Sequence, residues 1–187
     1  QHSQRRARFL ESVINLDAAE NVLAKAEPAL ASRSSMNTAA QKQYVAAQKL
    51  LLASETQMKA ATLAATTSKV TLAALQKQLI SVQLAATSIE GSLAGARGAA
   101  KALNDSTELA QAVARLDAAQ KRIGSDLAGL QAKADTEQKV AVKTQEKLET
   151  AETTFVQATS QANKLKARSE ELATSVANLT SQVKQAK

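Results

Sequence analysis

Apolar residues recur every seven positions along two long runs of this 187-residue chain, and a short polar break separates the runs. In the first run, residues 23–103, two rows offset by three residues carry mostly Leu, Ala and other small or apolar side chains, among them Leu23, Leu30, Leu51, Leu72, Leu79 and Leu93. In the second, residues 108–187, the rows include Leu109, Leu116, Ile123, Leu130, Leu165, Leu172 and Leu179. These are the a and d positions of a heptad repeat written abcdefg, so the spacing predicts a left-handed coiled coil.

The break itself reads Leu103-Asn104-Asp105-Ser106-Thr107-Glu108. Asn and Asp tolerate left-handed backbone and compete with helical hydrogen bonding, so they favour a turn. Asp105 and Glu108 have the spacing of a capping box, and Ser106 or Thr107 is an alternative N-cap. We therefore expect a turn at 104–107 and a new helix after it. The sequons at Asn104 and Asn178 are short enough to arise by chance.

The predicted fold is all-α: a long antiparallel two-helix coiled-coil hairpin. A turn between 104 and 105 pairs residues whose numbers sum to 209, which places large side chains opposite small ones, such as Phe155 opposite Ser54. The same register places Glu137 opposite Leu72 and Gln120 opposite Ile89, and a buried polar residue in a seam often fixes register. Arms of about 80 residues at about 1.5 Å per residue predict a rod of roughly 120 Å.

Four segments are expected: an amphipathic helical extension at 1–22, a first arm at 23–103, the turn at 104–107 and a second arm at 108–187. Pro28 lacks an N–H and clashes with the preceding turn, so a kink or hinge is expected within 28–37. The apolar stripe of the extension, for which a base-docking role is expected, consists of Phe9, Leu10, Val13, Ile14 and Leu16.

Three alternatives remain for the extension. It folds back as a third helix at the base with Pro28 at the corner, it docks on another protomer or on a missing part of a larger protein, or it lies on an anionic membrane beside Arg5, Arg6 and Arg8. Because Phe9 and Leu16 share the heptad frame of Leu23, a kinked continuation of the first arm is also compatible with the sequence.

Two further surfaces are predicted on the first arm. A row at b and f positions faces away from the second arm and is expected to mediate self-association: Leu52, Leu63, Val70, Ile80 and Leu84. Glycine costs about 1 kcal/mol relative to alanine within a helix. Gly91, Gly95 and Gly98 near the turn therefore suggest either a smooth contact surface for a partner backbone or a soft distal end.

Composition argues against catalytic chemistry. The chain has no Cys and one His, at position 2. It shows neither a Gly-rich phosphate loop nor a His–carboxylate cluster, so we predict no enzyme, no cofactor, no metal site and no small-molecule ligand. The net charge of +7 is spread along the chain, and no module or aromatic platform for specific nucleic-acid binding is present.

The sequence thus predicts a non-enzymatic structural protein, either a rod-like spacer or a self-assembling subunit of the filament or surface-layer type, whose partner is a second copy or another protein. One alternative is an adaptor-like hairpin that presents its glycine-rich tip to a protein, and another is a membrane-surface helical protein. The chain begins with Gln1, which suggests a removed leader or an excised fragment, and its Ala-, Thr-, Ser- and Gln-rich composition favours an exported or cell-surface location.

Overall fold

The computed structural model describes residues 2–103 and 106–187, and these residues form two helices. Helix α1 spans His2–Ala102 and helix α2 spans Thr107–Ala186. The helices pack against each other as an all-α hairpin, which confirms the predicted fold class. No strand occurs in the described part of the chain.

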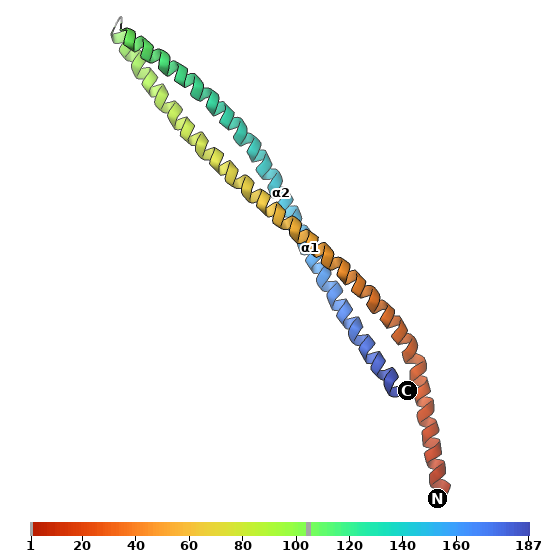
Figure 1. Ribbon diagram of the computed structural model, residues 1–187. Helices are drawn as coiled ribbons and strands as arrows, with labels where there is room; N and C mark the ends of the chain where they lie inside the picture. Colours follow the sequence, from red (N-terminus) through yellow and green to blue (C-terminus); the bar gives the residue numbers. More distant parts are fainter. Residues whose placement is uncertain (1, 104–105) are drawn as a thin grey trace. The chain divides into compact units, whose positions relative to one another are not determined.

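The hairpin divides into two compact units. Unit 1 combines Gln1–Gln57 with Glu152–Lys187, and unit 2 is the continuous segment Met58–Ala151. In each unit a segment of α1 runs antiparallel to a segment of α2 (Figure 1). Unit 2 therefore contains the ends of both helices that flank residues 104–105, the part of the predicted turn that lies outside the described residues.

The seam between the helices consists of the predicted a and d positions. In unit 1 the buried residues are Ala26, Ala40, Ala47, Ser54, Ala162, Leu172 and Val183, and in unit 2 they are Ala65, Ser68, Leu79, Leu93 and Ala134. Most of these side chains are small, because two helices that meet along a narrow stripe leave little volume between them. The heptad pattern thus identified the buried face of both helices.

Three predicted seam residues are nevertheless exposed: Arg33, Leu103 and Gln120. Leu103 follows the last residue of α1, so the helical frame no longer directs it at α2. Arg33 and Gln120 carry long polar side chains, which keep their end groups in water because burial without a partner is costly. The expectation that Gln120 is a buried polar residue opposite Ile89 is therefore wrong.

Two polar pairs define the register within unit 2. Ser68 Oγ donates to Glu137 Oε1 at 2.6 Å, and Arg97 Nη2 pairs with Asp117 Oδ1 at 2.7 Å. The residue numbers of the first pair sum to four less than 209, and those of the second pair sum to five more. The two pairs deviate in opposite directions. If one helix were shifted by a heptad relative to the other, in either direction, one of the two pairs would be 11 or 12 residues out of alignment. That offset is about 16–18 Å along the helix axis, too far for either contact. Both pairs therefore fit the predicted register.

Ser106 provides the N-cap of α2. The Leu109 N–H donates to Ser106 Oγ at 3.4 Å, and the Ala110 N–H donates to the Ser106 carbonyl at 3.2 Å. This is the alternative cap expected from the sequence, whereas the expected capping role of Asp105 falls outside the described residues. Lys101 lies in the last turn of α1 and Glu108 in the first turn of α2, where their charges complement the helix dipoles.

Helix α1 continues through Pro28. Residues 2–22 are part of this helix rather than a separate third helix, and 28–37 are helical throughout. Proline removes a single backbone N–H and disturbs one preceding turn, while the heptad frame of Phe9 and Leu16 runs on into Leu23. The seam positions on both sides of Pro28 are thus compatible with one continuous helix.

Candidate interaction surfaces

One polar pair between the helices lies within the seam. Ser68 is 4% exposed, and its hydroxyl donates to the Glu137 carboxylate. The sequence placed Glu137 in the seam but did not identify Ser68 as its partner. The pairing could have been inferred from the serine at the d position one turn before Leu72, because a short hydroxyl side chain leaves room for the longer glutamate of the facing helix. This pair belongs to the α1–α2 contact, so it is a structural element rather than an outward-facing site.

The predicted self-association row lies on the outer surface of α1. In unit 2 its members are exposed by 57–70%: Leu63, Val70, Ile80 and Leu84. Leu52, in unit 1, is also exposed. Leu63, Val70 and Leu84 share the f position, and Ile80 lies one turn before Leu84 at a b position. In unit 2 the row therefore forms a stripe on α1 away from the seam.

The threonine hydroxyl groups at the b positions of this stripe donate hydrogen bonds to backbone carbonyls of α1 itself. Thr66 Oγ1 donates to the Thr62 carbonyl at 2.8 Å, and Thr87 Oγ1 donates to the Gln83 carbonyl at 3.1 Å. Both threonines lie at b positions, like Ile80. Because their polar atoms already have partners, these residues contribute methyl groups to the stripe with little desolvation cost.

The three glycines near the end of α1 have free space where a side chain would be. A Cβ built on Gly91, Gly95 or Gly98 meets no atom within 4 Å, so α1–α2 packing does not require glycine at these positions. Gly91 and Gly98 continue the f row of Leu63, Val70 and Leu84. Two of the three glycines therefore lie on the same stripe of α1 as the predicted apolar row, and Gly95 lies beside it at a c position.

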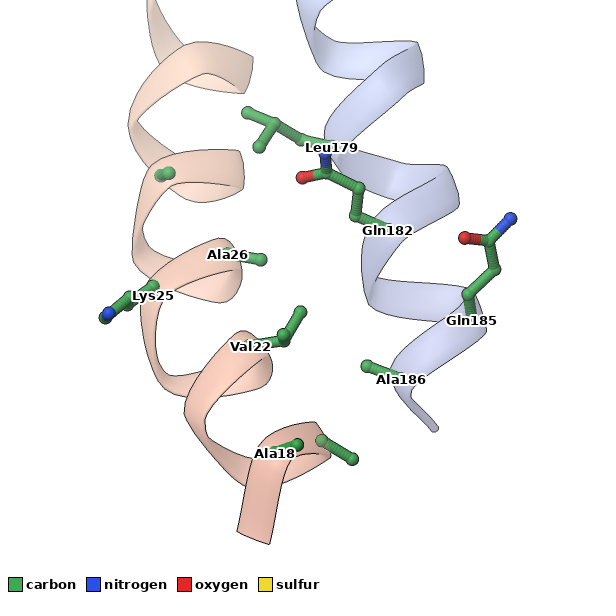
Figure 2. Close-up of a pocket in the computed structure, with 10 residues that line it drawn as sticks. Ala18, Val22, Lys25, Ala26, Leu179, Gln182, Gln185 and Ala186 are labelled. Atoms are coloured by element: carbon green, nitrogen blue, oxygen red, sulfur yellow. The ribbon is translucent and has the colours of Figure 1, made fainter. Parts of the chain in front are cut away.

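The predicted base-docking residues of unit 1 are all exposed on α1: Phe9, Leu10, Val13, Ile14 and Leu16. They lie N-terminal to an open groove between the helices, whose α1 wall includes Val22 and Ala26 and whose α2 wall includes Leu179, Gln182 and Ala186. Val22 and Ala26 point toward α2, whereas Lys25 points away (Figure 2). None of the five base-docking residues lines this groove.

An ion pair in unit 1 joins Lys187, the residue after α2, to Glu27 of α1. Lys187 Nζ lies 3.1 Å from Glu27 Oε1, and both side chains are more than half exposed. An exposed pair of this kind contributes at most about 1 kcal/mol. The apolar residues that line the groove are mostly alanines: Ala18, Ala19, Ala26, Ala29 and Ala186.

The described residues contain no cluster of side chains suited to binding a metal ion. No group of three or more His, Cys, Asp or Glu side chains is arranged to hold a metal ion within 2–103 and 106–187. Across the same residues, no helical stretch has the length and apolar character needed to cross a bilayer.

Comparisons with models of protein families, with characterised proteins and with solved structures found no significant match to this chain.

Proposed function

We propose that this protein is a non-enzymatic structural coiled-coil subunit that self-associates through the outer stripe of α1. The observation that supports this proposal is the row of Leu63, Val70, Ile80 and Leu84, which stays 57–70% exposed in unit 2 while the seam is filled by smaller side chains. Isolated exposed leucines are ordinary, but a repeated row on one helix marks a contact surface.

The thin seam supports the same proposal. Alanine and serine account for eight of the twelve buried residues, Ala26, Ala40, Ala47, Ser54, Ala65, Ser68, Ala134 and Ala162. Small side chains bury little apolar area, at about 25 cal/mol per Å², so the α1–α2 contact alone gives modest stability for the length of helix involved. Association with another copy would bury the exposed leucine, valine and isoleucine side chains of the stripe.

The test is the oligomeric state of the whole chain. Wild-type protein should form assemblies whose size rises with concentration in light scattering and negative stain, and Leu63→Glu combined with Val70→Glu should abolish them. The matched control is Val142→Glu combined with Val156→Glu, which adds the same charge at exposed valines of α2. A monodisperse wild-type monomer at every concentration would refute the proposal.

An adaptor role is a second candidate, because Gly91, Gly95 and Gly98 leave open space that the hairpin itself does not need. In this role the glycine surface would accept the backbone of a protein partner. Gly95→Lys should then abolish capture of that partner without changing self-association. Loss of self-association alone would argue against the adaptor role.

A membrane-surface role is a third candidate, supported by the exposed Phe9 and Leu10 directly after Arg5, Arg6 and Arg8. Such a segment should sediment with anionic vesicles, and sedimentation should fall as salt rises. Binding that is absent at low salt would exclude this role.

A further inference from the structure

We infer that two copies of this chain associate antiparallel through the outer stripe of α1 in unit 2, in a register that opposes Leu63 of one copy to Ala94 of the other. This inference rests on the proposed self-association and adds the partner, the orientation and the register. The stripe is defined by the b and f positions from Leu63 to Ala94, and the e positions border it on one side.

Charge complementarity selects the orientation. The e positions of α1 in unit 2 read Thr62, Lys69, Gln76, Gln83, Glu90 and Arg97 in order. In an antiparallel pair, Lys69 of each copy meets Glu90 of the other, and Gln76 meets Gln83. Lys69 and Glu90 are both exposed, so they are available for this contact.

A parallel pair lacks this complementarity. There the e positions of one copy face the c positions of the other, which are Ala60, Thr67, Ala74, Ser81, Ser88 and Gly95. These residues carry no charge, so Lys69 and Glu90 would have no ionic partner. The pattern of charges therefore favours the antiparallel pair.

Side-chain size selects the same register. When Lys69 meets Glu90, the stripe positions oppose one another so that residue numbers sum to 157. Leu63 then faces Ala94, Val70 faces Thr87, and Leu84 faces Ala73. Two of these layers therefore place a leucine opposite an alanine, and the third places two side chains of similar volume, so no layer brings two large side chains together.

The glycines avoid steric hindrance between the two helices, and the threonines avoid the burial of unpaired hydroxyl groups. Gly91 faces Thr66 of the second copy, and Gly98 flanks Ala94 one turn away, so neither position holds a Cβ that would push the helices apart. The Thr66 and Thr87 hydroxyls keep their hydrogen bonds to their own helix. Lys77 faces Ile80 near the two-fold axis, where its aliphatic stem covers the isoleucine while the ammonium group stays in water.

Cysteine cross-linking of the full chain tests the register, because the natural sequence has no Cys. Leu63→Cys mixed with Ala94→Cys should give a disulfide-linked heterodimer under mild oxidation, whereas Leu63→Cys alone should not. A cross-link from Leu63→Cys alone would show the parallel arrangement and overturn the inference. The exposed Val156→Cys, mixed with Leu63→Cys, measures random collision.

Charge exchange tests the ion pairs independently. Lys69→Glu or Glu90→Lys should weaken self-association by about tenfold in sedimentation equilibrium, because two ion pairs become two repulsive contacts. The double variant should restore the wild-type value. Lys139→Glu, at an exposed position of α2, controls for the change in net charge.

The outcomes separate the inference from the proposed function. If the Leu63→Glu and Val70→Glu variant dissociates but the single charge variants do not, self-association through the stripe stands and this register is wrong. If the wild-type chain is monomeric, both are wrong. Circular dichroism of each variant verifies that the helices are retained.

Discussion

Ser68 on α1 and Glu137 on α2 are joined by a hydrogen bond of 2.6 Å within the seam of unit 2. Because the serine side chain is buried, its hydroxyl has exchanged water for this single partner. We expect Ser68→Ala to lower the free energy of unfolding by about 1–3 kcal/mol, since the acid then loses its donor in a partly buried position. Urea unfolding monitored by circular dichroism measures the change, with the exposed Thr71→Ala as control.

Replacing both members of this pair should give the opposite result. Ser68→Ala combined with Glu137→Leu converts the layer to apolar packing against Leu72, and such replacements are often neutral or stabilising. We expect a midpoint at or above that of the wild type. A double variant less stable than Ser68→Ala would show that the acid stabilises the seam through contacts other than this hydrogen bond.

Leu93 is the most buried leucine of the seam, at 2% exposure. Leu93→Ala should destabilise the hairpin by about 2–4 kcal/mol, because it removes buried methyl groups and leaves a cavity between the helices. Thermal unfolding below the concentration of self-association measures this loss. The surface variant Val156→Ala should change stability by less than about 0.5 kcal/mol.

The N-cap of α2 depends on the side chain of Ser106, which accepts the Leu109 N–H. Ser106→Ala should cost about 1 kcal/mol and should speed amide hydrogen exchange at the start of α2. Thr107→Ala is the neighbouring control, since Thr107 is the first residue of α2 and no cap bond to its side chain is seen in the described structure. Equal exchange in both variants would contradict the capping role of Ser106.

Pro28 interrupts the hydrogen bonding of α1, because it has no N–H to donate to the Ala24 carbonyl. Pro28→Ala should therefore stabilise the helix by about 1–3 kcal/mol. Slower amide exchange across residues 24–32 and a higher thermal midpoint are the expected signs. Unchanged exchange would mean that the neighbouring turns are already limited by opening of the helix elsewhere.

The open space at the glycines predicts a gain in helix stability. Gly124 on α2 has no atom within 4 Å of a Cβ position, so Gly124→Ala should raise the free energy of unfolding by up to about 1 kcal/mol. Gly91→Ala should give a similar gain in the monomer. If the antiparallel stripe forms, Gly91→Ala should also weaken self-association, whereas Gly124→Ala should not.

The repeat of seven was sufficient to identify the buried face of both helices, because side-chain burial in a coiled coil follows directly from helical geometry. The register was predicted from the turn between 104 and 105 and from the sizes of facing side chains, such as Phe155 opposite Ser54, and the pairs Ser68–Glu137 and Arg97–Asp117 fit it. The repeat could not identify the behaviour of Pro28: local propensity favours a kink there, while the frame of Phe9 and Leu16 favours continuation, and only the structure decides between them.

The outer surfaces were predictable in part. Exposure of Leu63 and Val70 followed from their f positions, but which surface recognises a partner is not encoded in the periodicity of a single chain. The cap was ambiguous because Asp105, Ser106 and Thr107 are all good N-cap residues. The exported location and the identity of the partner stay predictions from composition.

The predominance of alanine in the seam also determines how this hairpin should respond to temperature. Unfolding exposes little apolar surface for its length, so the heat-capacity increment per residue should fall below the usual range of about 12–15 cal/mol/K. The curve of free energy against temperature should then be shallow, with a broad calorimetric transition and weak cold destabilisation. Copies joined through the leucine stripe would show a larger increment than isolated ones, which makes calorimetry at two concentrations sensitive to assembly.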